Sequence, residues 1–505
     1  MNTARTSLRC MILLVSTMLL PSTVVAAERP NVLFVFLDDY GWRDCGYMGS
    51  DFYETPTIDR LAKSGMVFTD AYAAAANCAP SRACLLSGQY TPRHEIYNVG
   101  TGLRGNPKHS KLKHVPGTDT LTTDITTWAQ LAQSAGYRTG TIGKWHLSND
   151  PIPYGFDFNF AGSHSGSPPR GYYAPHPGAP GLKDAPKDEY LTDRLSEEAA
   201  NFIERNKERP WLLYLTHFAV HTPLQGRPDL VSKYDAKEPG ELHNHPVMAA
   251  MIESVDNGLK QVVDTLDRLK LTDNTIIIFT SDNGGYGPAT NMDPLKGYKG
   301  TYYEGGIRVP MFVSWPGRTK PGSRCSVPVS NVDIFPTICE MIGAEMPGEQ
   351  VQDGQSLLPL LDGKTPGKDR SLYWHFPAYL QGYSRADEQR DPIFRTRPCS
   401  VVRHGNWKLH EYFEDRMVAS EVDKNPLVGL ELYDLSVDVS ESKNLVESHP
   451  EKASELLRRL HRWQEQTNAP IPTTPNPAYD PAAEEKELTR QSKKGVNRKN
   501  AKRKR

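Results

Sequence analysis

An unbroken run of β-prone apolar residues, NVLFVFL at 31–37, constrains the fold of this chain more than any other feature. A strand with one exposed face would alternate apolar and polar residues, so this run predicts a strand buried on both faces. Further strands are predicted at 137–142, 211–219 and 275–280, and amphipathic helices at 56–64, 124–134, 190–206 and 247–269. This alternation predicts an α/β fold with a large mixed, mostly parallel sheet sandwiched by helices.

The pattern changes after about residue 365. Short strands predicted at 372–376, 400–403, 407–412 and 431–435, followed by a helix at 450–467, indicate a smaller C-terminal subdomain with an antiparallel sheet. From 470 to 505, proline, charge and low hydrophobicity predict a disordered tail. We therefore expect a large α/β domain at 28–365, a subdomain at 366–469 and a basic tail at 470–505.

The first 27 residues are typical of a secretory signal peptide. Arg5 and Arg9 precede an apolar run at 10–20, and small residues at 23–27 favour cleavage near Ala27. The alternative is an N-terminal membrane anchor, but the run is short for a bilayer, and no later segment is apolar enough to span one. The leader predicts a secreted or periplasmic protein.

Overall composition gives no case for a nucleic-acid partner, because the 505-residue chain has a formal net charge of −1. The balance hides a basic end, since residues 493–505 hold eight Lys or Arg and no acid. Six cysteines remain after the leader, too few in this length for a disulfide scaffold, and the sequence does not determine their pairing.

Acidic and amide side chains directly follow two of the predicted strands. Asp38 and Asp39 come after the first strand, and Asp282 and Asn283 come after the strand at 275–280. Ligands bind beyond the carboxyl ends of strands in α/β sheets, where these oxygens would repel one another without a cation. Either pair alone is more often a turn or a helix cap. Together they favour Ca²⁺ or Mg²⁺ over zinc.

Cationic and imidazole groups are predicted at the same edge. Lys144 and His146 follow the strand at 137–142, and His221 follows the strand at 211–219. Lys299 lies in a glycine-rich segment, and Arg82 follows Cys78 in a stretch where residues after Pro80 open a predicted helix. Each group alone is more often structural or solvated. Jointly, with a divalent cation and a helix N-terminus, they suit a tetrahedral oxyanion.

Several motifs give this chain a family resemblance. Cys78 stands in the stretch NCAPSRACLLSG at 77–88. Other matching motifs are LDDYGW at 37–42, TPTIDRLA at 55–62, GKWH at 143–146, YGFD at 154–157, SDNG at 281–284 and KGTYYEGG at 299–306. Over about 31–445 the chain resembles type I sulfatases of the alkaline phosphatase superfamily, such as arylsulfatase A and N-acetylgalactosamine-6-sulfatase. The resemblance implies an alkaline phosphatase-like fold, with the domain at 28–365 catalytic.

The resemblance also implies a mechanism. A formylglycine-generating enzyme would oxidise Cys78 to formylglycine (3-oxoalanine), whose hydrate would attack sulfur. One Ca²⁺ would be held by Asp38, Asp39, Asp282, Asn283 and residue 78. Arg82 and Lys144 would orient the nucleophile, while Lys144 and Lys299 would neutralise the sulfate oxygens. His221 or Lys299 would protonate the departing alcohol, and His146 would accept a proton from the second hydroxyl.

The substrate and two alternatives stay open. A sulfated carbohydrate or an aryl sulfate is the expected substrate. The basic loop at 97–116 has two equally good interpretations, a contact with a polyanionic substrate and an ordinary solvated surface loop. His164, Arg170, Tyr172, Tyr173 and His176 are candidates for a sugar subsite. The alternatives are a phosphonate or phosphate ester hydrolase of the same superfamily, and a non-catalytic protein that binds sulfated glycans.

Overall fold

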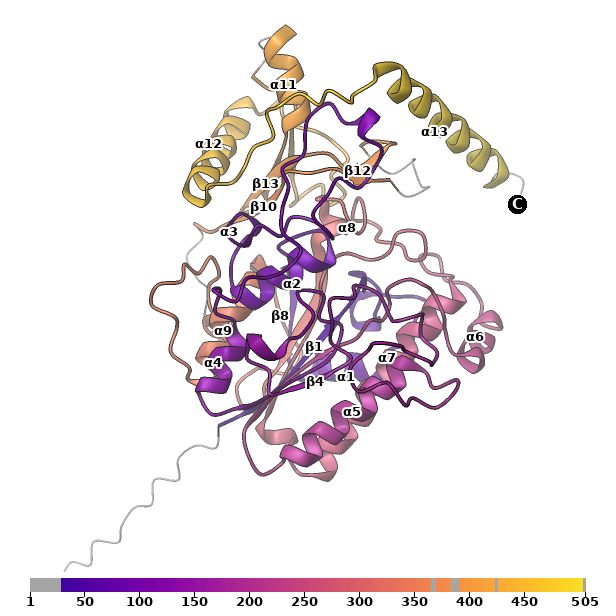
Figure 1. The fold of residues 1–505 in the computed structure, drawn as a ribbon, viewed down its shortest axis with the longest axis vertical. Helices are drawn as coiled ribbons and strands as arrows, with labels where there is room; N and C mark the ends of the chain where they lie inside the picture. Colours follow the sequence, from indigo (N-terminus) through magenta and orange to yellow (C-terminus); the bar gives the residue numbers. More distant parts are fainter. Residues whose placement is uncertain (1–28, 365–368, 383–389, 423–425, 503–505) are drawn as a thin grey trace, which may run out of the picture.

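The computed structural model describes residues 29–364, 369–382, 390–422 and 426–502 (Figure 1). The predicted signal peptide at 1–27 lies outside these ranges. Within them, we find no helix whose length and apolar character would let it cross a bilayer.

A nine-stranded sheet forms the centre of the main domain. Its strands are β1 (Asn31–Leu37), β2 (Met66–Tyr72), β3 (Arg138–Gly143), β4 (Phe158–Phe160), β5 (Trp211–Thr216), β6 (Thr275–Ser281), β7 (Arg308–Ser314), β8 (Ser323–Cys325) and β9 (Val329–Ser330). The order is β4-β3-β5-β1-β6-β7-β2-β8, with β9 beside β2. Only β7 pairs antiparallel with its neighbours. The prediction of a mixed, mostly parallel sheet is confirmed.

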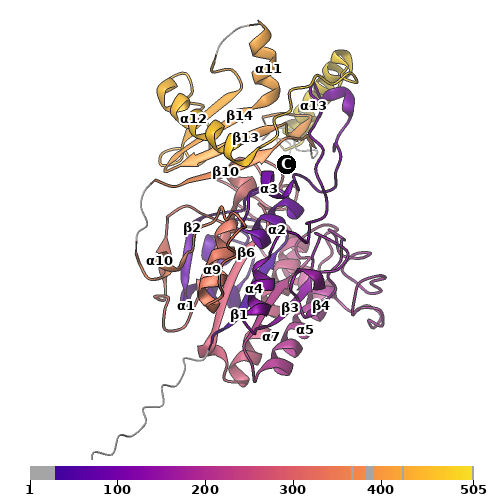
Figure 2. The ribbon, with the colours of Figure 1, turned by 60° about the vertical axis from the view of Figure 1, so that its left-hand side comes forward.

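Strand β1 explains why its sequence is apolar throughout. Leu33, Val35 and Leu37 pack into the core on one face, with α1 (Pro56–Ser64), α5 (Leu191–Asn206) and α7 (Pro246–Arg268). Its alternate residues pack into the core on the other face, with α2 (Cys78–Ser87), α4 (Trp128–Ser134) and α9 (Ile334–Ile342). Figures 1 and 2 show these helices on either side of the sheet. The strand is buried on both faces, as the sequence predicts.

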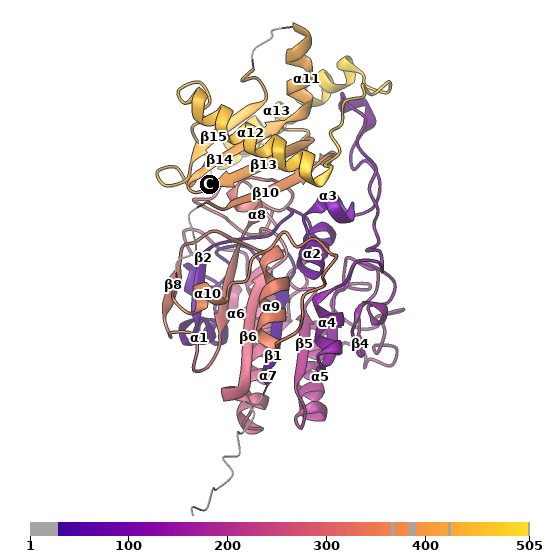
Figure 3. The same ribbon diagram turned by 90° about the vertical axis from the view of Figure 1, so that its left-hand side faces the viewer.

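The C-terminal subdomain stands at one end of the main sheet (Figure 3). Its antiparallel sheet has the order β10 (Ser371–Phe376), β13 (Cys399–His404), β14 (Trp407–Tyr412), β15 (Leu430–Asp434). Helix α12 (Pro450–Thr467) covers one face, where Trp463 stacks on Tyr373 at 4.8 Å between ring centroids. On the other face Trp374 Nε1 donates to the carbonyl of Ala73 at 2.8 Å. The subdomain is therefore packed directly onto the α/β domain.

The remaining elements are short or peripheral. They are α3 (Thr91–His94), α6 (Pro228–Asp235), α8 (Glu304–Ile307), α10 (Leu358–Leu361), α11 (Phe413–Val422), α13 (Pro481–Lys502), the paired strands β11 (Leu380–Gln381) and β12 (Phe394–Thr396), and 3₁₀ turns at Gly46–Met48, Pro107–His109, Ile152–Tyr154, Thr272–Asn274 and Asn331–Asp333. The helix predicted at 124–134 begins only at Trp128, because a capping box joins Thr127 and Gln130.

The described part of the tail differs from the predicted disorder. The backbone of Thr474 accepts from Lys113 N at 2.8 Å, and Asn476 N donates to Lys111 O at 2.7 Å. Helix α13 follows, with Glu484 accepting from Arg397 Nη2 at 2.9 Å. The prediction of disorder is wrong for 470–492. It is based on low hydrophobicity, which indicates that a segment buries little apolar surface, whereas this segment is held by backbone hydrogen bonds and ion pairs.

Stability should fall in acid partly through His375, which is fully buried in β10. Its Nδ1 lies 2.7 Å from Ser400 Oγ and its Nε2 lies 3.1 Å from Pro470 O. Burial, partly offset by the bond to Pro470, lowers the pKa of His375 to about 3. The pKa of His375 is lower in the folded state than in the unfolded state. The contribution of neutral His375 to the free energy of unfolding is therefore complete above about pH 6.5, and it is lost as pH falls toward 3.

We therefore expect thermal stability of the wild type to decline below about pH 6.5 more steeply than that of His375→Gln. Between about pH 6.5 and pH 5, the wild type should lose about 2 kcal/mol more free energy of unfolding than the variant. Glutamine can still accept from Ser400 and donate to Pro470 but cannot titrate. Melting temperatures between pH 5 and pH 8 test this, and parallel curves would contradict it.

Candidate active site

The two acidic pairs meet because β1 and β6 are adjacent parallel strands. Leu37 is in register with Ser281, so Asp38 and Asp39 emerge beside Asp282 and Asn283. Asp39 N donates to Asp282 Oδ1 at 3.2 Å. All four side chains are buried. The expected convergence at the carboxyl edge of the sheet is present.

Oxygen atoms in this cluster have the features of a cation site. Asn283 Nδ2 donates to Asp39 Oδ1 at 2.9 Å, while Asn283 Oδ1 and Asp38 Oδ1 are buried without hydrogen-bond partners among the described residues. One ligand atom from each of Asp38, Asp39, Cys78 and Asp282 lies within 4.8 Å of the others. Burial and the neighbouring Asp38 charge raise the pKa of Asp282 to about 6. This crowded oxygen set fits a hard divalent cation.

Each of the three carboxylates also has a cationic partner. Lys144 Nζ lies 2.6 Å from Asp38 Oδ2, and Lys299 Nζ lies 2.6 Å from Asp39 Oδ1. The Arg82 guanidinium donates twice to Asp282 Oδ2, at 3.0 and 2.9 Å. Burial alone would raise the pKa of Asp39, but Lys299, His221 and Lys144 hold it well below its usual range. The cations are therefore fixed at the site rather than solvated.

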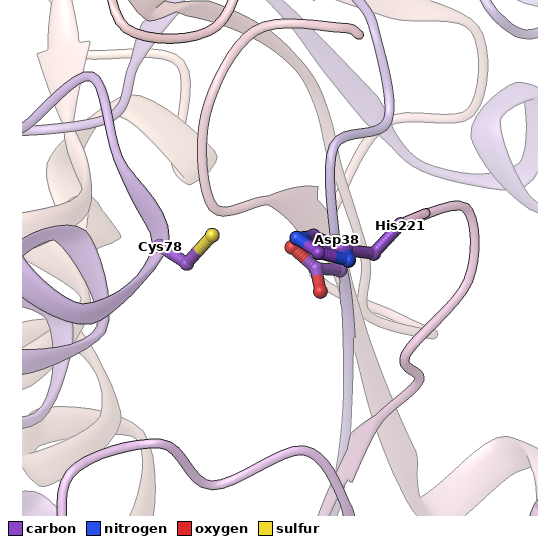
Figure 4. A group of neighbouring side chains, drawn as sticks. All are labelled: Asp38, Cys78 and His221. Carbon is purple, nitrogen blue, oxygen red and sulfur yellow. The ribbon is translucent and has the colours of Figure 1, made fainter. Parts of the chain in front are cut away.

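Cys78 begins helix α2 and faces this cluster. Figure 4 shows its sulfur directed toward Asp38, with His221 beside the carboxylate. Cys78 Sγ accepts from Lys299 Nζ at 3.2 Å. Burial raises the pKa of the Cys78 thiol to about 11, although Lys144 and Lys299 oppose the rise. As a cysteine, residue 78 is therefore a protonated thiol at neutral pH and a poor nucleophile.

The helix start adds to the anion-binding character of the site. Asn77 is the N-cap, and the first intrahelical bond runs from Ser81 N to Asn77 O at 3.1 Å. The sequence predicts a helix that starts after Pro80. The helix instead begins at Cys78, two residues earlier, and Pro80 lies in its first turn. Backbone N–H groups of that turn lack intrahelical partners and favour negative charge.

Both predicted histidines lie near these residues. His221 Nδ1 lies 2.7 Å from Thr222 O, and its Nε2 lies 4.0 Å from Asp39 Oδ2. Burial, then the Lys299 charge, lowers the pKa of His221 to about 3. His146 Nδ1 is buried without a partner among the described residues. Burial, then the Lys144 charge, takes the pKa of His146 well below its usual value.

Residue Thr216 was missing from the sequence prediction. It ends β5 in register with Gly143, and its Oγ1 accepts from Arg82 Nη1 at 2.6 Å. Gly143 has a φ of +110°, and a Cβ there would lie 1.9 Å from Thr216 O. Glycine is thus required for the turn that delivers Lys144. Strand pairing across the sheet is the signal that would have revealed Thr216.

The predicted sugar subsite is largely structural. Tyr172 is buried and donates to the backbone carbonyls of Phe218 and His221, at 2.8 and 2.9 Å. Tyr173 donates to Gly226 O at 3.1 Å, and His176 Nδ1 lies 3.1 Å from Pro169 O. The two tyrosines therefore support the segment 218–226 around His221, and His176 contacts its own loop.

The two other predicted subsite residues remain candidates. His164 is half-buried, and its ring centroid lies 6.4 Å from that of His146. Arg170 is exposed. All six cysteines among the described residues are buried free thiols, so no disulfide competes for Cys78.

Comparison with known proteins agrees with this geometry. The family profile described as Sulfatase matches residues 30–344, and one described as N-sulphoglucosamine sulphohydrolase, C-terminal, matches 298–468. A sulfatase of Formosa agariphila is 31% identical over 528 residues, covering 88% of this chain and 90% of the relative. An N-acetylgalactosamine-6-O-sulfatase of Bacteroides thetaiotaomicron is 30% identical over 522 residues, covering 86% and 93%.

Solved structures give the same result. The crystal structure of Ps i-CgsB, also determined in complex with k-i-k-neocarrahexaose, matches with a TM-score of 0.69 and 28% identity. The match covers 92% of this chain and 98% of that one. The fold and sequence together define a hydrolase of sulfuric esters. The chain belongs to the sulfatase family, as its motifs predict.

Proposed function

We propose that this sulfatase is exported, carries formylglycine at position 78, binds one Ca²⁺ and hydrolyses sulfate monoesters of a carbohydrate. The observation that carries the proposal is the place of Cys78. Its sulfur sits at the head of α2, 3.2 Å from Lys299 Nζ and within 4.8 Å of oxygens from Asp38, Asp39 and Asp282.

The buried ammonium groups of Lys144 and Lys299 would bind the sulfate group. Lys144 and Lys299 are held by Asp38 and Asp39, so their ammonium groups need no reorganisation when an anion arrives. The N-terminus of α2 adds unpaired N–H groups. Asp38, Asp39, Asp282 and Asn283 would hold Ca²⁺, which supplies further positive charge at the sulfate oxygens.

Nucleophilic chemistry needs a group other than the thiol. Formylglycine would supply, through its hydrate, one hydroxyl to attack sulfur and a second whose deprotonation would re-form the aldehyde and expel sulfate. Arg82 follows position 78 by four residues in α2, and Asp282 and Thr216 hold its guanidinium group. His146 Nδ1, which has no partner among the described residues, is the base that accepts the released proton.

The departing alcohol oxygen needs a proton donor. His221 Nε2 and Lys299 Nζ lie 4.0 and 2.6 Å from the carboxylate oxygens of Asp39, so both candidates lie beside the same side chain. Replacing each in turn, as His221→Asn and Lys299→Met, and comparing aryl sulfates of differing leaving-group basicity would assign the donor. The variant that loses the true donor slows most with the most basic leaving group.

A carbohydrate substrate is supported by the relatives. One of them is named for N-acetylgalactosamine 6-O-sulfate, and Ps i-CgsB was crystallised with a neocarrahexaose. Maturation by a formylglycine-generating enzyme and export through the leader complete the proposal.

Three measurements test the proposal. The mass of the Cys78 peptide should show aldehyde in place of thiol. Turnover of 4-nitrophenyl sulfate should exceed that of an aryl phosphonate, since the opposite order would favour the phosphonate hydrolase alternative. Desulfation of defined sulfated saccharides should then identify the sugar, and an unmodified thiol with no turnover of any sulfate ester would indicate the glycan-binding alternative.

A further inference from the structure

We propose that the C-terminal subdomain positions Lys299 for catalysis, and that Arg395 and Lys408 are the positioning residues. The inference rests on the role proposed above for Lys299. It assigns a function in the reaction to a part of the chain that supplies none of the groups clustered around residue 78.

Lys299 belongs to a glycine-rich turn between β6 and β7. Its backbone N donates to Gly285 O at 3.0 Å, and Gly300 N donates to Ala76 O at 2.8 Å. Gly305 N closes the turn on Lys296 O at 2.8 Å. The turn is thus bonded both to the segment before Cys78 and to the segment after Asn283. Its backbone geometry determines the position of the Lys299 ammonium group.

Arg395, from the C-terminal subdomain, donates a hydrogen bond to this turn. It lies in β12 and is buried, with Nη1 donating to the backbone carbonyl of Lys299 at 3.2 Å. Its Nε donates to Gln381 O in the paired strand β11 at 2.9 Å. The guanidinium therefore links the β11–β12 pair directly to the residue whose side chain contacts Cys78.

A second set of contacts between the subdomain and the turn lies five residues after Lys299, at Glu304. Lys408 Nζ, from β14, lies 2.9 Å from Glu304 Oε1 and 3.0 Å from Glu441 Oε1. Glu441 Oε2 accepts from Glu304 N at 2.6 Å, and its backbone carbonyl accepts from Lys296 Nζ at 3.1 Å. The side chains of Glu304, Lys408 and Glu441 are all 0% exposed. Both ends of the Lys299 turn are therefore held by subdomain residues.

Stability alone does not account for so many buried charges. Removing ions from water is costly, and apolar residues of similar volume often stabilise as well or better, so buried pairs are best attested where they fix geometry. Fixed geometry matters here because a shift of about 1 Å in a catalytic group can cost on the order of 10² in rate.

A double-mutant cycle tests the coupling. Arg395→Met, and separately the charge-balanced pair Lys408→Met with Glu441→Gln, are made in the wild type and in Lys299→Met. In the wild type each should lower kcat/KM for 4-nitrophenyl sulfate by about 10- to 100-fold. Where Lys299 is the proton donor, the loss is greater for phenyl sulfate, whose leaving group is more basic. In Lys299→Met the same changes should cost little more.

Leu456→Ala is the matched control. Leu456 is buried in α12 on the opposite face of the subdomain sheet, so this change weakens the subdomain without touching the turn. It should leave the phenyl to 4-nitrophenyl ratio unchanged. Fully additive losses in the cycle, or a changed ratio in the control, would overturn the proposal.

Crystal structures of Arg395→Met and of the Lys408/Glu441 double variant give a readout that is independent of turnover. Lys299 Nζ should leave the positions 2.6 Å from Asp39 Oδ1 and 3.2 Å from residue 78 Sγ that it has here. An unmoved Lys299 would overturn the inference. A wild type that turns over no sulfate ester would instead overturn the proposed function, and the crystallographic comparison would still decide the inference.

Discussion

Cys78→Ala is expected to lose about 10⁶-fold in kcat, which is the scale seen when a catalytic nucleophile is removed. The substitution deletes one buried sulfur at the first position of α2, where the main chain keeps its bonds to the helix. We expect folding to survive, because alanine is tolerated at a helix start and the deleted volume is small. Turnover of 4-nitrophenyl sulfate and the melting temperature measure the two effects separately.

Cys78→Ser gives a sharper test of the chemistry. A serine hydroxyl beside Lys299 and Asp38 can still attack sulfur, but a serine sulfate ester has no second hydroxyl to expel the group. We therefore expect one alcohol product per protein molecule and then arrest, with the protein heavier by one sulfo group. Intact mass must first show that the substituted serine is unmodified.

Two outcomes would contradict this. Steady turnover by Cys78→Ser would show that the formylglycine hydrate is dispensable. A fully active wild type whose Cys78 peptide retains the thiol would remove the reason for maturation altogether. The raised pKa of the buried thiol makes the second outcome chemically unfavourable.

The sequence predicted most of the site because its residues follow strands that are apolar enough to recognise. Asp38 and Asp282 directly follow β1 and β6, and adjacent parallel strands place their carboxyl ends at one edge. The periodicity of apolar residues does not indicate which strands are neighbours in the sheet. The adjacency of β1 to β6 and of β3 to β5 joins segments far apart in the chain, and only that order explains Thr216 as a partner of Arg82.

Loop residues were predicted less well for a related reason. Tyr172 and His176 have the chemistry of a sugar subsite, but a backbone carbonyl of the His221 loop accepts from the Tyr172 hydroxyl, and Pro169 O lies beside His176 Nδ1. Composition reports what a side chain can bond, not which backbone groups come within reach. The same limit applies to 470–492, where the order depends on bonds to a loop more than 350 residues earlier in the chain.

The second large effect concerns the cation. We expect Ca²⁺ to raise the melting temperature of the wild type, and a chelator to lower it and abolish turnover. At a concentration of about 100 times Kd, binding to the folded state alone adds about 2.7 kcal/mol. The oxygens that would gain are those now lacking partners among the described residues, Asp38 Oδ1 and Asn283 Oδ1.

Asp38→Asn and Asp282→Asn should each remove this Ca²⁺-dependent shift. They should also destabilise the protein by about 3–5 kcal/mol, because Lys144 or Arg82 is left as a buried, uncompensated charge. The matched control is Asp333→Asn, which leaves Arg370 without its buried partner and changes none of the residues of the cation cluster. That variant should be comparably destabilised yet keep the full Ca²⁺ shift.

Calorimetric melting with and without Ca²⁺ separates the two contributions, since the loss of an ion pair appears in both conditions and the loss of the metal appears in one. If Asp38→Asn and Asp282→Asn retained the wild-type shift, Ca²⁺ would be acting elsewhere on the protein. The three carboxylates would then be balanced by Lys144, Lys299 and Arg82 alone, and the sulfate oxygens would have to be neutralised by those cations and the start of α2.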